Sequence, residues 1–290
     1  MTKKTISLVL GSGGARGIVH IGIIKWLQEH NYEIKSISGC SMGALVGGFY
    51  AAGKLDAYAE WLETIDVLDM LKLLDFKGSG GFISGEKLMN KLQTLVGDEK
   101  IENLPIKFTA VATDIDAQKE VWINEGSLLD AIRASISLPL FFTPFEYKGK
   151  RLVDGGVLNP VPIAPTFHDS TDLTISVNLG GEPLTQEPMK EEVSQSSMQK
   201  TIKEYFSKIS IPDSFTKESG MYTIANKSFE TMQSSIARMK LAAYPSDIEI
   251  DIPMNLCGTF EFNKAQELIA YGYKYCDNIA ELKELHGKSI

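Results

Sequence analysis

Two glycine-rich junctions, each between an apolar run and a helical pattern, constrain the fold of this chain more than any other feature. Residues 5–10 and residues 34–38 are short β-branched and apolar runs, and both end in glycines. Residues 18–30 and 42–52, which follow the two junctions, fit helices. Strand, helix, strand and helix in this order predict parallel strand pairing, with helices covering both faces of the sheet.

The rest of the chain continues the same pattern. We expect further helices over residues 56–65, 86–96, 127–135, 218–240 and 263–285, and further strands over residues 107–113, 120–123, 151–153 and 172–179. Ser84 is the expected N-cap of the helix at 86, and Asn263 with Gln266 the expected capping box of the last helix. Residues 180–200 are polar and predict a surface loop or lid. The sequence therefore predicts a three-layer α/β/α fold with a mainly parallel central sheet.

Charge and cysteine content exclude several classes of protein. The 290 residues carry a formal net charge of −8, and nucleic-acid binding instead needs dense basic charge. Three cysteines without metal-type spacing predict reduced thiols. No apolar run is long enough for a secretory signal or a membrane span. We therefore expect a cytoplasmic protein that binds no nucleic acid.

The second junction, Gly39-Cys-Ser-Met-Gly43, matches the pattern G-x-S-x-G. In a sharp turn from strand to helix, flanking glycines let the backbone close up and leave the serine hydroxyl exposed. The positive end of the following helix favours an oxyanion at the same place. Ser41 is therefore a candidate nucleophile, although a small-residue packing seam has the same composition.

The first junction, GSGGARG at residues 11–17, frees several backbone N–H groups to bind an anion. A dinucleotide-binding loop requires G-x-G-x-x-G, and counting from Gly11 the third glycine position holds Arg16. The lysine and hydroxyl of a phosphate-binding P-loop are also missing. An oxyanion hole is the stronger interpretation of this loop.

A third motif, Asp154-Gly-Gly, offers a carboxylate at the end of a strand, although Asp-Gly is also a common turn. The chain has only four histidines for a conventional triad: His20, His30, His168 and His286. By chain order, His286 is the one that could complete a Ser-Asp-His triad of the α/β-hydrolase type. Surface or capping roles suit all four as well.

Together and in this order, GSGGARG, GCSMG and DGG resemble the patatin-like phospholipases, in particular the compact bacterial members. Four further stretches extend the resemblance, which covers roughly residues 5–180: residues 20–23, residues 131–139, Phe142 with Pro144, and residues 159–162. The resemblance implies a patatin-like catalytic core at 5–180. Residues 181–290 are then expected to form a C-terminal lid or helical extension packed on the same domain.

The resemblance further implies a Ser-Asp dyad without histidine, in which Ser41 is the nucleophile and Asp154 the base. Backbone N–H groups of Gly13 and Gly14 would form the oxyanion hole, and Arg16 would support their loop. The other motif positions are Gly11, Gly17, Gly39, Gly43, Gly155 and Gly156. Ser12 departs from the pattern, because the family often has glycine there.

These features predict a serine acyl hydrolase that cleaves carboxylic esters of lipids through an acyl-enzyme, of phospholipase A, lysophospholipase or esterase type. We expect neither a metal nor an organic cofactor, and transient contact with a membrane surface; the oligomeric state stays open. Two alternatives remain. One is an α/β-hydrolase-type esterase with a Ser-Asp-His triad, and the other is a non-enzymatic nucleotide- or lipid-binding module.

The helix expected at 218–240 carries an apolar stripe that includes Met221, Phe229, Met232 and Met239. The stripe predicts either a face packed on the core or the border of an acyl-chain channel.

Overall fold

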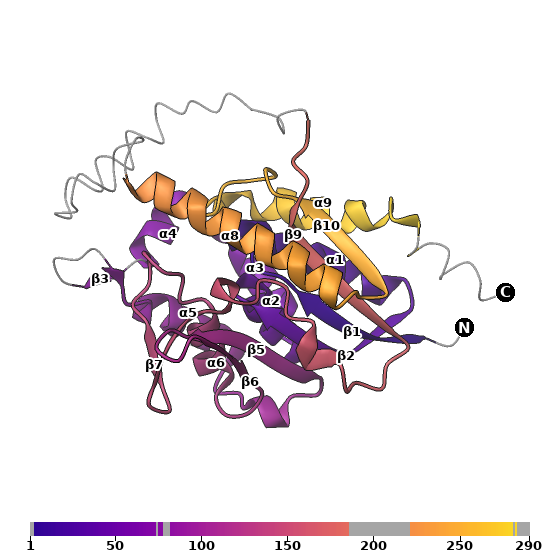
Figure 1. Ribbon diagram of the computed structural model, residues 1–290, viewed down its shortest axis with the longest axis horizontal. Helices are drawn as coiled ribbons and strands as arrows, with labels where there is room; N and C mark the ends of the chain where they lie inside the picture. Colours follow the sequence, from indigo (N-terminus) through magenta and orange to yellow (C-terminus); the bar gives the residue numbers. More distant parts are fainter. Residues whose placement is uncertain (1–2, 74, 78–81, 186–220, 281, 283–290) are drawn as a thin grey trace.

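A computed structural model describes residues 3–73, 75–77, 82–185, 221–280 and 282 of the chain (Figure 1). The strands lie at β1 (Lys4–Leu10), β2 (Tyr32–Cys40), β3 (Phe76–Lys77), β4 (Phe82–Ile83), β5 (Lys107–Asp114), β6 (Lys119–Ile123), β7 (Phe145–Tyr147), β8 (Lys150–Asp154), β9 (Leu173–Gly181) and β10 (Ile248–Pro253). The α-helices lie at α1 (Val19–Glu29), α2 (Met42–Ala51), α3 (Leu55–Thr64), α4 (Val67–Leu73), α5 (Glu86–Val96), α6 (Leu128–Ser135), α8 (Met221–Ala243) and α9 (Ala265–Cys276). Short 3-10 turns include η1 (Gly14–Ile18), η3 (Gly155–Val157), η4 (Ala164–Thr166) and η6 (Phe262–Lys264).

The central sheet has the strand order β10-β9-β1-β2-β5-β8-β7, with β6 also paired to β5. The five strands from β10 to β5 are parallel to their neighbours, whereas β6, β7 and β8 add antiparallel pairs. The parallel part follows from the βαβ order of the sequence, because a crossover helix returns the chain to the same edge. The predicted mainly parallel sheet is confirmed.

Helices cover both faces of this sheet. The alternate residues Ile6, Leu8 and Leu10 of β1 belong to the large core cluster, which α1, α2 and α9 complete. Val9 points to the opposite face, where it packs with Val161, Ile163, Ala237 and Leu241 in a second cluster. The last two residues come from α8, which Figure 1 shows lying across the front of the sheet. The predicted three-layer α/β/α fold is thus confirmed.

Two sequence-based expectations about helix caps were wrong, and one strand of the central sheet, β10, was not predicted. The N-cap of α5 is Gly85 rather than Ser84, and the carboxylate of Asp75 accepts hydrogen bonds from the N–H groups of Gly85 and Glu86. The capping box of Asn263 and Gln266 is not formed, because the last helix, predicted at 263–285, runs from Ala265 to Cys276 after the 3-10 turn η6 and has no side-chain cap. Strand β10 extends the sheet beyond β9. Most of the polar loop predicted at 180–200 lies outside the described residues.

The three cysteines, Cys40, Cys257 and Cys276, are free and buried, as predicted for reduced thiols. Within the described residues, no helix combines the length and the apolar character that a membrane span requires.

Candidate active site

Ser41 occupies a strained turn between β2 and α2. Its backbone angles are φ 55° and ψ −121°, a conformation that side-chain-bearing residues rarely adopt. The flanking glycines make the turn possible. A Cβ atom on Gly39 would lie 2.5 Å from the carbonyl oxygen of Gly43, and one on Gly43 would lie 2.1 Å from that of Leu10. The G-x-S-x-G pattern therefore forms the predicted turn from strand to helix.

The side chain of Ser135 holds this turn in place, a role that the sequence pattern alone did not reveal. The backbone N–H of Ser41 donates a 2.8 Å hydrogen bond to the Ser135 hydroxyl. That hydroxyl in turn donates a 2.6 Å hydrogen bond to the carbonyl of Val111 on β5. Ser135 ends α6 and lies in the stretch 131–139, which carries part of the family resemblance but no motif that predicts this role.

We expect Ser135→Ala to lower kcat for ester hydrolysis by about tenfold or more while KM changes little, because small misplacements of a nucleophile are costly. The change leaves two buried backbone groups without their partner. Ser127→Ala is the matched control. Ser127 caps the same helix by accepting a 3.2 Å hydrogen bond from Asp130, so its loss should cost about 1 kcal/mol of stability and spare kcat. Equal losses of kcat in both variants would contradict a positioning role.

Asp154 reaches Ser41 because β5 pairs with both of their strands. Cys40 lies opposite Val111 in the β2–β5 pair, and Asp154 lies opposite Ala112 in the β5–β8 pair. The Asp154 side chain is fully buried. One carboxylate oxygen, Oδ1, accepts a 2.7 Å hydrogen bond from the N–H of Gly156, and the Cys40 thiol lies 3.9 Å from it. The other, Oδ2, has no well-formed hydrogen bond within the described residues.

Burial raises the pKa of Asp154 to about 6, because the charged carboxylate is costly away from water. The nearby Ser41 hydroxyl, the Gly156 N–H and the Cys40 thiol lower the pKa, but by less than burial raises it. The Ser41 hydroxyl is thus near enough to Asp154 to lower the pKa of its carboxyl group, although Oδ2 has no hydrogen-bond partner in the described structure. A carboxylate with this pKa is a stronger base than one in water and is still ionised at neutral pH.

The glycine loop lies beside Ser41, because β1 and β2 are neighbours and Leu10 pairs with Gly39. Hydrogen bonds hold both ends of the loop: Ser12 N–H donates to Pro160 at 2.8 Å, and Ala15 N–H to Thr259 at 2.9 Å. Between them, the N–H groups of Gly13 and Gly14 have no hydrogen-bond partner within the described part of the chain. Gly14 has φ +56°, which suits glycine.

The side chain of Arg16 connects the glycine loop to a distant segment. Its guanidinium donates to the carbonyl oxygens of Met254 at 2.8 Å and Cys257 at 3.4 Å, both after β10. The segment from Met254 to Thr259 thus braces the glycine loop, a contribution that no sequence motif had indicated.

The remaining motif glycines permit close packing around these groups. A Cβ atom added to Gly11 would lie 2.6 Å from Val177, and one added to Gly17 would lie 2.3 Å from Met42. A Cβ atom added to Gly155 would lie 2.1 Å from Val111, and one added to Gly156 would lie 2.1 Å from Gln233.

Helix α8 approaches the same place from the other layer. Gln233 lies against Gly156, and its amide nitrogen is 3.4 Å from the hydroxyl of Ser12. Sequence analysis did not single out Gln233. The apolar periodicity of α8 identified a helix but gave no indication of which polar side chain turns inward.

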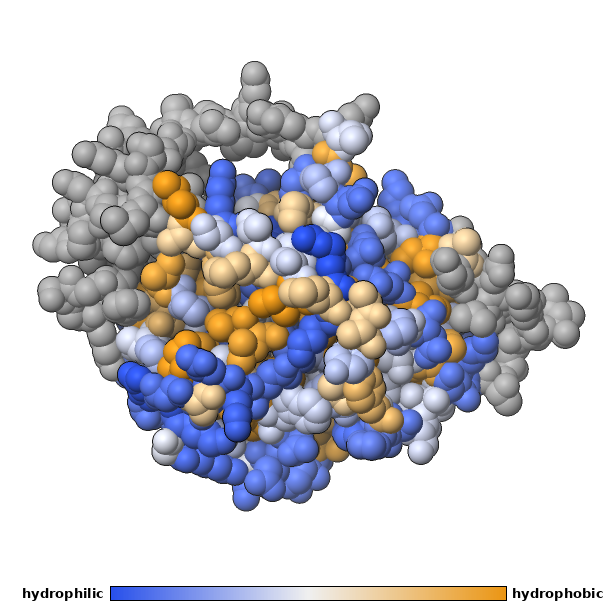
Figure 2. Space-filling view, in the orientation of Figure 1, coloured by the Kyte–Doolittle hydropathy of each residue, from blue (hydrophilic) through white to orange (hydrophobic). Residues whose placement is uncertain are grey.

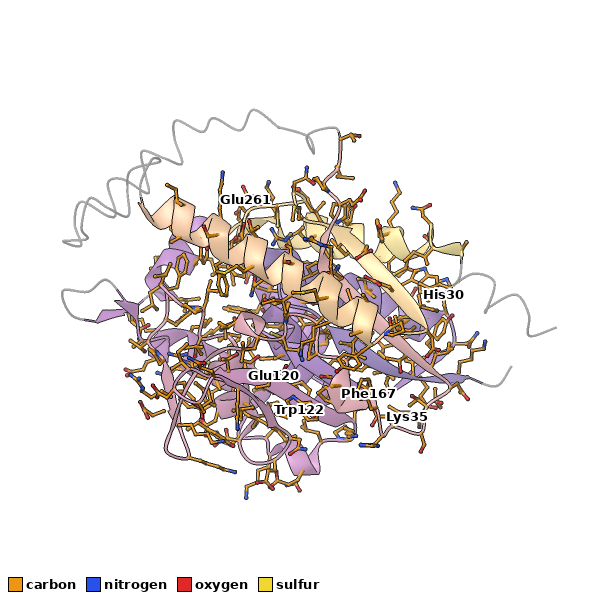
Figure 3. All side chains as sticks on the ribbon, in the orientation of Figure 1. His30, Lys35, Glu120, Trp122, Phe167 and Glu261 are labelled. Carbon is orange, nitrogen blue, oxygen red and sulfur yellow. The ribbon has the colours of Figure 1, made fainter. Side chains whose placement is uncertain are left out.

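None of the described histidines reaches the Ser41–Asp154 pair through a hydrogen bond. His20 is buried, lies 2.9 Å from the carbonyl of Gly11, and has its pKa lowered to about 4 by burial. His30, which Figure 3 labels, lies at the end of α1 and stacks on Trp26. His168 is exposed, and His286 lies outside the described residues. In the described part of the chain, no three His, Cys, Asp or Glu side chains gather into a metal-type cluster.

Comparison with known proteins decides the family. The Patatin-like phospholipase family matches residues 8–167. An NTE family protein of Mycobacterium tuberculosis is 36% identical over 97% of this chain and 92% of its own length. The chain belongs to the patatin-like phospholipase family. This membership confirms the family resemblance and the predicted enzyme class, a lipid acyl hydrolase.

More distant relatives of the patatin-like chain are much longer. The lysophospholipase nte1 of Emericella nidulans is 27% identical over 94% of this chain and 18% of its own length. Patatin-like phospholipase domain-containing protein 6 of Homo sapiens is 27% identical over 95% of this chain and 20% of its own length. The chain therefore spans about a fifth of these two relatives. The match to the crystal structure of VipD from Legionella pneumophila covers 99% of this chain and 67% of the VipD chain, with 17% sequence identity and a TM-score of 0.48.

Proposed function

We propose that this patatin-like protein hydrolyses carboxylic esters of lipids through a Ser41–Asp154 dyad. The observation that carries the proposal is the strained turn that presents the Ser41 hydroxyl to a buried carboxylate with a pKa raised to about 6. A serine hydroxyl is a poor nucleophile until a base takes its proton, and we assign that role to Asp154.

The reaction follows from the groups around the pair. Asp154 takes the hydroxyl proton of Ser41 while the Ser41 oxygen attacks the ester carbonyl carbon. This attack forms a tetrahedral oxyanion. The N–H groups of Gly13 and Gly14 serve as oxyanion donors, and one such donor contributes about 3 kcal/mol to catalysis. Asp154 then returns the proton to the departing alcohol, which leaves an acyl-Ser41. Water, activated by the same carboxylate, releases the fatty acid and restores the serine.

The substrate class rests on the family and on the names of the relatives, one of which is a lysophospholipase. We propose a phospholipase A, lysophospholipase or esterase activity on lipid esters, exercised in the cytoplasm with transient contact with a membrane surface. We also propose that residues 181–290 belong to the same domain as residues 5–180. In support, β10 extends the common sheet and α8 reaches Ser12.

The triad alternative makes a different prediction about histidine. Under the dyad, His168→Ala and His286→Ala should each leave kcat/KM within a few-fold of the parent, because no histidine takes part in proton transfer. A triad histidine typically contributes several orders of magnitude. The measurement is steady-state hydrolysis of a p-nitrophenyl ester, with circular dichroism to verify folding. A loss of about a thousandfold or more in a folded His286→Ala protein would establish the triad.

The non-enzymatic alternative is disfavoured by the same geometry. A binding module has no use for a strained serine turned toward a desolvated carboxylate, since both features are costly to keep.

A further inference from the structure

The outer face of α8 is apolar where a packed helix is usually polar. Ile224, Met232 and Met239 are 70%, 56% and 61% exposed, respectively, and helical spacing places them on one side of the helix. Met232 and Met239 belong to the apolar stripe that predicts either a face packed on the core or the border of an acyl-chain channel, and Ile224 lies on the same stripe. The structure turns these three side chains to the surface, so for them the packing expectation was wrong. Figure 2 shows apolar side chains on the face of the molecule that carries α8.

Contacts on the inner face fix this orientation of α8. Ala237 and Leu241 are buried in the second core cluster. Lys240 forms a 2.7 Å ion pair with Glu120 of β6, which Figure 3 labels, and Glu230 accepts a 2.6 Å hydrogen bond from the hydroxyl of Thr259. Because polar and apolar partners on the body of the protein already engage the inner face, the outward methionines cannot turn inward by a simple rotation.

The charges of α8 are divided in the same way. Its exposed charged residues are two cations, Lys227 and Arg238, which lie beside the apolar stripe. Glu230, the acidic residue of the helix, is turned toward Thr259. Among the described side chains of α8, the outer face therefore combines cations with exposed apolar groups and carries no acid. The chain as a whole has a formal net charge of −8. A negatively charged partner surface is therefore repelled by the rest of the protein and attracted by the cations on the outer face of α8.

We infer that the outer face of α8 docks on an anionic lipid surface. An amphipathic helix with large apolar residues and cations on its exposed side lies in the interface of a bilayer, where anionic headgroups pair with the cations. The inference rests on the proposed function and deepens it, because the inner face of the same helix touches Ser12 and Gly156 beside the dyad. Docking through α8 places the catalytic layer directly beneath the membrane surface.

The test measures binding of the full chain to vesicles, with Ser41→Ala in every protein so that no lipid is consumed. Vesicles of phosphatidylcholine are compared with vesicles that also contain phosphatidylglycerol. We expect binding to the anionic vesicles to fall at least about tenfold in Met232→Asp/Met239→Asp, because the apolar contact is lost and two negative charges face the headgroups. Lys227→Ala/Arg238→Ala should lose about tenfold or more on anionic vesicles and little on neutral ones.

The control is Ile115→Asp, which places one negative charge at an apolar residue that is 41% exposed on the turn between β5 and β6, and it is compared with Met232→Asp and Met239→Asp singly as well as with the double variant. It should change vesicle binding by less than about twofold, since a charge away from the docking face is screened. Unchanged vesicle binding in Met232→Asp/Met239→Asp, or an equal loss in Ile115→Asp, would overturn the inference. So would light scattering that shows a dimer in the parent and a monomer in the α8 variant, because a second copy would then occupy the stripe.

A soluble short-chain ester separates this inference from the proposed function. With Ser41 restored, Met232→Asp/Met239→Asp should hydrolyse p-nitrophenyl butyrate as fast as the parent, which supports docking as a separate step. If the parent hydrolyses no ester and the Ser41→Ala protein still binds anionic vesicles through α8, the proposed function fails and the docking surface stands.

Discussion

Replacing Ser41 with alanine is expected to lower kcat/KM for lipid and p-nitrophenyl esters by at least about 10⁴-fold, since loss of a catalytic serine nucleophile has effects of this size or larger. The change removes the proposed nucleophile and leaves the backbone turn, which the N–H of Ser41 anchors to Ser135. An activated phosphonate should label the parent at Ser41 and leave the variant unlabelled, as mass spectrometry of the digested protein can show.

The control for this experiment is Ser38→Ala, three residues earlier on β2. Ser38 is also buried, and its hydroxyl has no hydrogen-bond partner in the described structure. Its loss should leave turnover and labelling unchanged. Hydrolysis at the parental rate by a folded Ser41→Ala protein, or phosphonate on another residue, would reject Ser41 as the nucleophile.

Asp154→Asn is expected to reduce kcat/KM by about a thousandfold or more and, at neutral pH and above, to stabilise the fold. The activity falls because an amide cannot accept the proton of Ser41. The stability rises because the native state no longer holds a desolvated charge. In the parent, kcat/KM should increase with pH through about 6, where Asp154 becomes ionised.

The sign of the stability effect follows from the raised pKa. In the unfolded chain the Asp154 carboxyl has its ordinary pKa near 4, and in the folded protein the pKa is about 6. Between these values the native state binds the proton more tightly, so the contribution of Asp154 to stability falls as pH rises from about 4 to 6. The asparagine variant lacks this loss. Its advantage in the free energy of unfolding should therefore grow over that window to at most about 3 kcal/mol and then stay constant.

Denaturant unfolding of parent and variant at pH 4 and pH 8 measures this difference directly. Equal destabilisation by Asp154→Asn at both pH values would mean that the native carboxyl is not desolvated, and the case for a tuned base would fall. A folded Asp154→Asn protein with normal turnover would refute the assignment of the base itself.

Local patterns in the sequence predicted the parts of the fold that depend on local interactions. The glycine junctions and the apolar runs beside them gave β1, α1, β2 and α2, because turn geometry and strand–helix periodicity are encoded within about ten residues. The turn at Ser41 follows from the same short-range pattern. The sequence does carry a local signal for strand β10, which the prediction missed, because Ile248, Ile250 and Ile252 alternate with polar residues.

Other features depend on partners that are distant in the sequence. The carboxylate of Asp75, ten residues before Gly85, accepts the hydrogen bonds at the start of α5 that were predicted for Ser84. The hydroxyl of Ser135 reaches the N–H of Ser41 from another strand–helix unit. The outward orientation of Met232 and Met239 was equally inaccessible. Periodicity shows that a helix has an apolar side, but the sequence carries no local signal of which side the body of the protein will cover.

The contacts of the glycine loop also set an order of events during synthesis of the chain. Arg16 of the loop bonds to Met254, 238 residues later, and the strand that precedes the loop bonds through Thr5 to Asp172, 167 residues later. Contacts this distant form late, because the intervening chain must first be made and then closed into a loop. The loop beside Ser41 therefore lacks its braces until Thr259 has left the ribosome. A nascent chain released before that point carries all three glycine motifs but lacks the contacts that hold the N–H groups of Gly13 and Gly14 in place.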